Sequence, residues 1–210
     1  MNEIHRRAIS GVVYIVIMWF GASYSNFSCR LLFAILGIIS IYEMWKLRKE
    51  KSKFLAFIYI LTPFILIQFI LTKEGQENWN SNLILFMFIL TWIFDTFAYI
   101  VGVKFGKHKI MPSISPKKSW EGFAAGFVFT IIASYLSYSY FTFETILMPL
   151  SISIILPFTA TLGDFIESYY KREAGVKDSG GLMPGHGGML DRMDAFMITI
   201  PAIYILTKLL

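Results

Sequence analysis

The stretch of this chain from Ser168 to Asp194 concentrates the residue types that handle phosphate groups. It combines basic side chains, carboxylates and a histidine with six glycines, in a chain that is otherwise strongly apolar. Glycine-rich backbone can approach a phosphate closely and direct N–H groups at it. Lys and Arg neutralise phosphate charge, and carboxylates hold Mg²⁺. Its charged and ionisable members include Lys171, Arg172, Lys177, Asp178, His186, Asp191, Arg192 and Asp194.

The residues just before this stretch place a carboxylate on the same helical face as its first lysine. Asp164, Ser168 and Lys171 are spaced at i, i+4 and i+7, so one helix would carry them on one face. An unpaired carboxylate at mid-bilayer costs about 2.5–3.5 kcal/mol, so Asp164 should face a bundle interior with a partner. That partner is a cation or substrate, or else a basic side chain of a neighbouring helix. Glu167 points about 60° away from this face, and we expect it to matter less than Asp164.

Two further carboxylates follow at the end of the stretch. Asp191 and Asp194 are spaced at i and i+3, so they share a face at the start of the next helix. With Asp164 opposite, the three could hold a divalent cation through oxygen ligands. The alternative is that Asp191 and Asp194 only favour the positive end of the helix dipole. We predict a metal site made by Asp164, Asp191 and Asp194. Mg²⁺ is the expected ion, with a second cation, monovalent or divalent, as an option.

The histidine and the glycines beside it have two interpretations. His186 either binds a phosphate or transfers a proton, or it is a structural or solvated loop residue. The neighbouring Gly187 and Gly188 make the first interpretation as strong as the second, because they leave room for a phosphate beside the backbone.

A second polar loop lies between residues 104 and 119. Ser115-Pro116 fits the start of a helix, since proline is tolerated at the first helical position. Lys117, Lys118 and Ser119 then offer donors to phosphate, and we include Ser115, Lys118 and Ser119 among the predicted substrate-binding residues. The alternative is an ordinary basic flank of a membrane-spanning helix.

The rest of the chain must position these two loops, and its composition indicates a membrane protein. Of 210 residues, 56% are hydrophobic and 16% are charged, and the mean hydropathy is +0.60. We predict an all-α, polytopic transmembrane helix bundle of about seven helices, one domain over residues 1–210 with its catalytic half at about 91–200. Cys29 is the single cysteine, which excludes an internal disulfide. Apolar runs long enough to span a bilayer lie roughly at 8–24, 30–47, 54–72, 82–103, 120–140, 145–167 and 190–209.

The basic residues predict the orientation of these spans. If the N-terminus lies in the cytoplasm, sixteen of the nineteen Lys and Arg residues lie on the cytoplasmic side. Such a bias is typical of cytoplasmic loops. It predicts that the loops at 104–119 and 171–189 are cytoplasmic and functional, and that the loops near 25–29 and 73–81 are outside. The exceptions are Arg30, Lys73 and Lys208.

Several motifs of other enzyme classes are absent from the sequence. It contains no GxxxxGK[ST] phosphate loop, no GxGxxG fingerprint, no GxSxG elbow and no HExxH helix. A covalent serine or cysteine mechanism therefore has no support. Direct, metal-assisted transfer between two bound substrates fits the polar residues better.

The polar segments resemble the signature of the phosphatidate cytidylyltransferases, also called CDP-diacylglycerol synthases. The resemblance is dense over about 91–200. It rests on Ser168-x-x-Lys171-Arg172, Lys177-Asp178, Pro184-Gly185-His186-Gly187-Gly188, Asp191-Arg192-x-Asp194, Gly163-Asp164 and Ser115-Pro116-Lys117-Lys118-Ser119-x-Glu121-Gly122, and more weakly on Arg7-x-x-Ser10-Gly11. It implies a polytopic, Mg²⁺-dependent membrane enzyme, with a homodimer as one arrangement, that makes CDP-diacylglycerol and pyrophosphate from CTP and phosphatidate at the cytoplasmic leaflet.

The resemblance gives the polar residues roles in this reaction. Asp164, Lys171, Asp191 and Asp194 would be catalytic. The substrate-binding residues would be Ser115, Lys118, Ser119, Ser168, Arg172, Lys177, Asp178, His186, Gly187, Gly188 and Arg192. The bacterial cell membrane is the expected location, and nucleic acid is not an expected partner.

Other functions remain as alternatives. A related membrane cytidylyltransferase or phosphotransferase could act on another lipid phosphate. A transporter or channel would be expected to carry broken helices or inverted repeats near the midplane, whereas the charge here lies in loops and helix ends. A scaffold would not need clustered aspartates and glycines, and a CDP-alcohol phosphotransferase would need a DG…AR…G…D…D pattern that is absent.

Overall fold

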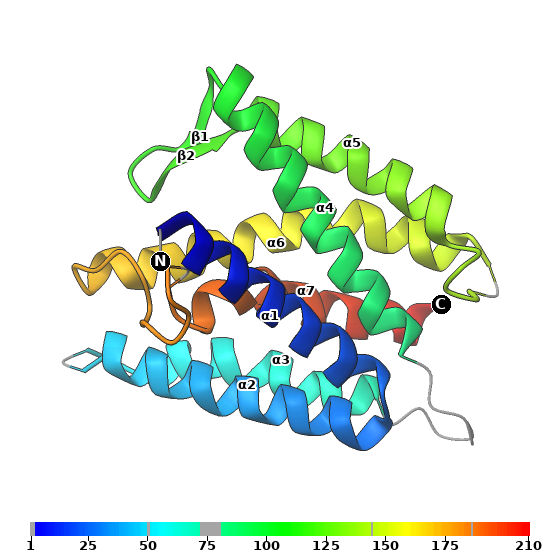
Figure 1. Cartoon of the computed structure of the whole chain (residues 1–210), viewed down its shortest axis with the longest axis horizontal. Coiled ribbons are helices and arrows are strands. Elements are labelled where there is room, and N and C mark those ends of the chain that lie inside the picture. The colour runs from blue at the N-terminus through cyan, green and yellow to red at the C-terminus, as the bar shows by residue number, and fades with distance from the viewer. Residues whose placement is uncertain (1–2, 50, 72–80, 144, 186) are drawn as a thin grey trace.

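The predicted bundle of about seven helices is confirmed by a computed structural model, which describes residues 3–49, 51–71, 81–143, 145–185 and 187–210 (Figure 1). Within these ranges the chain forms seven helices and one two-stranded hairpin. The helices are α1 (Glu3–Ser23), α2 (Asn26–Leu47), α3 (Phe54–Ile70), α4 (Asn82–Phe105), α5 (Trp120–Ser137), α6 (Leu147–Glu173) and α7 (Leu190–Leu209), and the antiparallel strands are β1 (Lys109–Met111) and β2 (Ser115–Ser119).

The outer surface of the bundle is apolar, as a lipid-facing surface must be. Four helices of the described chain, α2, α4, α5 and α6, are long and apolar enough to cross a membrane. The apolar parts of α1 and α3 are shorter, at Arg7–Ser23 and Phe54–Ile70. Large side chains such as Phe20 and Val103 are mostly exposed on the outside, which in water would make an unstable surface. The chain is therefore an integral membrane protein.

Helix α7 lies in the middle of the bundle, against α6, α3 and α2 (Figure 1). Its apolar face is fully buried and includes Met193, Phe196 and Ile200. Phe196 packs edge-on against Phe88 of α4, with ring centroids 5.5 Å apart. Because α7 is surrounded, the charged residues of its first turn are brought to one end of the bundle interior.

Helices α6 and α7 approach one another closely at Gly163. A Cβ atom added to this glycine would clash with the carbonyl oxygen of Asp194. A side chain larger than hydrogen at 163 would push the two helices apart. The contact places Asp164 beside the first turns of α7, and it therefore decides which acidic side chains can meet.

The predicted helix start at Ser115-Pro116 is wrong. Residues 115–119 form strand β2, which pairs with β1 through the Lys109–Ser119 and Met111–Ser115 positions. Helix α5 begins at Trp120, and the side chain of Ser119 caps it by accepting a hydrogen bond from Gly122 N at 3.2 Å. Pro116 lacks an N–H, which a strand of a small two-stranded hairpin tolerates. The serine that starts the helix is thus four residues later than the sequence suggested.

The polar loops gather at one end of the bundle. The start of α1, the hairpin β1–β2, the α2–α3 connection and the segment between α6 and α7 all lie at the left of Figure 1, while the C-terminus lies at the right. This grouping is the one that the distribution of basic residues predicts. Most of the predicted outer loop at 73–81 lies outside the described residues.

Candidate active site

A buried ion cluster joins α6 to the start of α7. Lys171 Nζ makes an ion pair with Glu167 one turn earlier on α6, and it lies 2.6 Å from Asp191 Oδ1. Glu167 is fully buried and Lys171 is nearly so. Buried charges of this kind persist only when they are paired. Glu167 therefore has a larger part in the site than its place on the α6 helical wheel predicts, and the Glu–Lys spacing of four residues was the signal for it.

The glycine-rich loop closes around the carboxylate of Asp191. Asp191 Oδ2 accepts hydrogen bonds from Ser179 N at 2.9 Å, Ser179 Oγ at 2.9 Å and Gly188 N at 2.7 Å. Gly187 has φ +84°, and a Cβ added there would lie 2.5 Å from Asp191 Oδ2. Glycine is required at this position both for its backbone conformation and for space. The loop thus uses some of its N–H groups to hold a carboxylate of the chain itself.

A second acidic group lies one turn further along α7. Asp164 and Asp194 lie close enough for their carboxyl groups to interact electrostatically, and Asp95 of α4 adds its charge to theirs. Lys118 Nζ lies 2.8 Å from Asp164 Oδ2, and Arg192 also interacts with Asp95. Two adjacent carboxylates repel one another, so such a pair either keeps a proton or binds a cation. The pair therefore has the chemistry of a site for a cation.

Oxygen ligands of this type suit Mg²⁺, which is bound in proteins through one or two carboxylates together with substrate phosphates. Among the residues that the structure describes, no three His, Cys, Asp or Glu side chains converge as a metal site. Of the three predicted ligands, the structure brings Asp164 and Asp194 together. It holds Asp191 on Lys171 and on the glycine-rich loop. The donor set present thus fits one Mg²⁺ at the Asp164–Asp194 pair.

The hairpin closes a cavity beside this pair. The cavity has a volume of about 220 Å³ and lies between α4, α5 and β2. Its polar lining comes from Asp95, Ser115, Lys117, Lys118, Ser119 and Thr161, and its apolar lining includes Phe94, Tyr99, Val103 and Phe123. Lys118 belongs both to the cavity and to the ion pair with Asp164. The three predicted substrate-binding residues of the hairpin, Ser115, Lys118 and Ser119, are therefore brought together next to the carboxyl pair.

Three further predicted residues, Arg172, Lys177 and Asp178, lie at the exposed end of α6 and in the loop after it. Ser168 is buried on α6. Arg172 is exposed and donates to Val176 O at 2.9 Å, and Lys177 and Asp178 are exposed in the loop. His186 lies outside the described residues.

Helix α1 packs against the glycine-rich loop and the start of α7. Ser10 Oγ donates to Pro184 O at 3.1 Å, and Tyr14 OH donates to Arg192 O at 3.4 Å. Gly185 has φ +79°, and a Cβ added there would lie 2.6 Å from the Arg7 side chain. The weakest part of the resemblance, Arg7-x-x-Ser10-Gly11, thus belongs to the same site as the strongest part.

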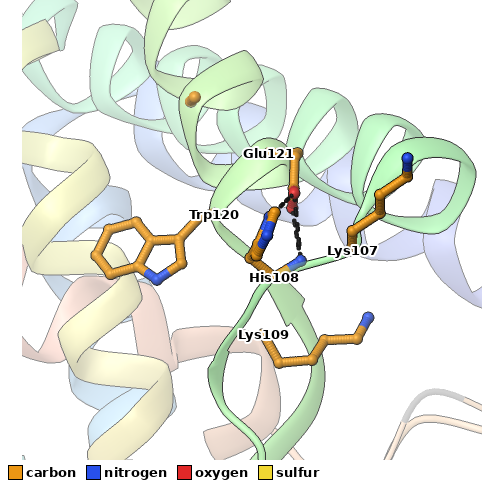
Figure 2. Close-up of a pocket in the computed structure, with 6 residues that line it drawn as sticks. Lys107, His108, Lys109, Trp120 and Glu121 are labelled. Carbon is orange, nitrogen blue, oxygen red and sulfur yellow. Dashed lines mark hydrogen bonds and ion pairs between the residues drawn. The ribbon is translucent and has the colours of Figure 1, made fainter.

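An exposed groove at the base of the hairpin is separate from these residues. Figure 2 shows the His108 ring bound to Glu121, with the two side chains 2.6 Å apart, and Trp120 pointing away from this pair. Lys107 and Lys109 lie at the edge of the groove. The pair ties the first turn of α5 to the connection between α4 and β1.

Comparison with known proteins gives one consistent result. A model of the cytidylyltransferase family matches residues 54–210. The chain is 37% identical over 216 residues to a phosphatidate cytidylyltransferase of Staphylococcus saprophyticus, with 98% of this chain and 82% of that protein covered. It is 38% identical to the phosphatidate cytidylyltransferase of Staphylococcus haemolyticus, with 87% of this chain and 70% of that protein covered.

Replacing Lys171, which pairs with both Glu167 and Asp191, measures how much the buried ion cluster contributes to stability. We expect Lys171→Met to lower the free energy of unfolding by about 3–5 kcal/mol, because it leaves the carboxylates of Glu167 and Asp191 without their cation. The measurement is chemical denaturation of the detergent-purified protein, with the exposed Lys177→Met as the matched control.

The double variant Glu167→Gln/Lys171→Met separates pairing from simple loss of packing. Its destabilisation should be smaller than the sum of the two single effects by at least about 1 kcal/mol. Strictly additive effects would contradict the ion cluster.

Proposed function

This chain belongs to the cytidylyltransferase family, and from that membership we propose that it transfers the cytidylyl group of CTP to phosphatidate. The products are CDP-diacylglycerol and pyrophosphate. The names of its relatives support this substrate pair. The structural observation that carries the proposal is the carboxyl pair of Asp164 and Asp194 beside a lysine-lined cavity at the surface of a membrane bundle. The alternative is the same transfer to another lipid phosphate.

The chemistry is a single displacement at phosphorus. An oxygen of the phosphatidate monoester forms a bond to the α-phosphorus of CTP, and the bond to the pyrophosphate oxygen breaks in line. A phosphate monoester is already largely ionised near neutral pH, so the reaction needs no strong general base. The chain must instead bring two polyanions together and offset their repulsion.

We assign the metal site to the acidic pair. Asp164 and Asp194 would hold Mg²⁺, which supplies charge neutralisation at the reacting phosphates when it is bound. Asp191 as a further ligand stays a prediction, because in this structure its carboxylate holds Lys171 and the loop. In our proposal Asp191 orients Lys171, which faces the same polar interior as Asp194.

The cavity behind the hairpin suits the phosphate of the lipid substrate. Its polar lining offers the hydroxyl of Ser115 and the ammonium groups of Lys117 and Lys118. Tyr99 and Val103 line it as well, and both are about two-thirds exposed on the outer face of α4. A ligand with a charged head and apolar tails fits such a lining, because the tails can remain in the bilayer.

The glycine-rich loop then remains for CTP. Arg172, Lys177 and Arg192 would bind the triphosphate, with Asp178, His186, Gly187 and Gly188 shaping the loop around the nucleotide. Exposed basic residues at the loop attract a polyanion from solution. Because CTP is a cytosolic nucleotide, this assignment requires the loop end of the bundle to face the cytoplasm, as the sixteen basic residues predict. The homodimer and the bacterial cell membrane stay predictions.

One assay tests the proposed function directly. Purified protein receives CTP labelled at the α-phosphate with phosphatidate, lysophosphatidate or a polyprenyl phosphate, in Mg²⁺ or in excess chelator. We expect labelled CDP-diacylglycerol and unlabelled pyrophosphate from phosphatidate alone, and no turnover with chelator. Faster transfer to another lipid phosphate would establish the alternative, and transfer that persists with chelator would remove the metal from the mechanism.

Asp164→Asn and Asp194→Asn should each reduce kcat at least about a hundredfold, since even the loss of a group that supports a metal ligand costs 10–100-fold. The apparent Mn²⁺ affinity should fall as well. The matched control is Glu121→Gln, a carboxylate near the hairpin that pairs only with His108 among the described contacts. Wild-type Mn²⁺ affinity in both aspartate variants would refute the assignment of the cation site.

Lys118→Ala should raise the KM for phosphatidate roughly tenfold, because a hydrogen bond between charged groups contributes about 1.5–3 kcal/mol. The KM for CTP should change less. Lys107→Ala is the control, since Lys107 is exposed and lines the separate groove beside His108 (Figure 2). An increase in the KM for CTP alone would place the nucleotide, and not the lipid, in the hairpin cavity.

A further inference from the structure

The start of α7 has no capping side chain of its own. Met189 is the residue before the helix, and it offers no side-chain acceptor to the first N–H groups. The first N–H groups of a helix lack partners within the helix, and when buried they need acceptors from elsewhere. These acceptors come from α2, more than 140 residues earlier in the chain. Glu43 Oε1 accepts from Met189 N at 3.0 Å, and Glu43 Oε2 accepts from Leu190 N at 2.8 Å.

Glu43 also holds the other side of the glycine-rich loop. Ser179 Oγ lies 3.0 Å from Glu43 Oε2 and 2.9 Å from Asp191 Oδ2. A serine hydroxyl donates only one proton, so Ser179 connects the two carboxyl groups and can satisfy one at a time. Ser179 therefore links the carboxyl group of Glu43 to that of Asp191, which pairs with Lys171.

The glycines of the loop fit around Glu43. A Cβ added to Gly180 would lie 2.5 Å from Glu43 Oε1, and one added to Gly188 would clash with Glu43 and Ser179. Neither glycine has a positive φ, so space and not backbone conformation explains them. Two of the glycines that suggested phosphate binding are thus needed for the passage of the backbone over a buried carboxylate.

Burial shows that this contact is part of the packed interior. Glu43 is 5% exposed, and Ser179 is 6% exposed. Among the described residues no ion pair with Glu43 is formed, and the positive end of the α7 dipole supplies the balancing charge. The residue lies outside the segment that the family model matches, which begins at residue 54.

We propose that Glu43 of α2 is a positioning residue of the active site. By capping α7 and holding Ser179, its carboxylate fixes the loop and the first turns of α7. Asp191 and Asp194 are thereby kept in register with Lys171 and Asp164 on α6. The effect on the loop follows from geometry alone, and the effect on turnover rests on the proposed function.

The test measures loop order and turnover in the same variants. In a Cys29→Ser background, Met183→Cys introduces a thiol at a buried loop position, and its labelling rate reports how often the loop opens. Glu43→Ala should raise this rate at least roughly tenfold, since it removes hydrogen bonds to a charged acceptor. In the otherwise unmodified chain Glu43→Ala should lower kcat by at least a similar factor and change both KM values less.

Ser40→Ala is the matched control. Ser40 is fully buried one turn earlier on the same helix, and no described contact joins it to the loop. It should leave the labelling rate, kcat and KM unchanged. Glu43→Gln keeps the shape and one acceptor oxygen, so it should fall between wild type and Glu43→Ala, and it serves as the test variant if Glu43→Ala does not fold.

The outcomes separate the two proposals. Unchanged labelling in folded Glu43→Ala or Glu43→Gln overturns the positioning role. Faster labelling with an unchanged kcat overturns its importance for the active site. If the wild-type protein does not turn over CTP at all, the proposed function fails, and the labelling rates still decide whether Glu43 holds the loop.

Discussion

The close approach of α6 and α7 at Gly163 sets the geometry of the charged end of this bundle. Without a Cβ atom at 163, the carbonyl of Asp194 can pack against α6, and Asp164 meets Asp194 as a direct consequence. Two adjacent carboxyl groups at the end of an apolar bundle repel one another unless positive charge is supplied. Lys118 supplies part of it from the hairpin. The pair therefore calls for further positive charge, which is why we propose it as the site of the divalent cation.

Contacts on the loop side of this approach hold the other acidic side chains of the cluster. On the loop side of the α6–α7 contact, Lys171 pairs with both Glu167 and Asp191. The loop N–H groups hold Asp191, while Glu43 holds the loop and the α7 start. Helix α1 adds the hydrogen bond from Ser10. Helices α1 and α2 thus hold in place the loop between α6 and α7, the two helices that carry most of the charged residues.

Much of the fold could be predicted from the sequence, because helix length and hydropathy are local properties. The apolar run at 82–103 corresponds to α4, and the run at 190–209 corresponds to α7. The hairpin was missed because Ser-Pro is compatible with a helix start and with an edge strand alike. Only the pairing with residues 109–111 decides between them, and such pairing is not visible in a single sequence.

The site was predictable to the extent that its residues are neighbours in the chain. Asp191 and Asp194 share a signature, yet the structure gives them different partners: Asp191 the loop, and Asp194 the acidic partner Asp164. Asp95 and Glu43 come from distant helices, and no local spacing ties either of them to the signature. Such residues reach the site only through the packing of helices that are far apart in the chain. A local sequence pattern therefore cannot identify them.

Anomalous diffraction from crystals grown with Mn²⁺ would locate the divalent cation that we propose for the Asp164–Asp194 pair. We expect an anomalous peak within ligand distance of both carboxyl groups, and the loss of this peak in Asp194→Asn. A peak held by Asp191 and Glu167 instead, with the Asp164–Asp194 pair left without an ion, would contradict it.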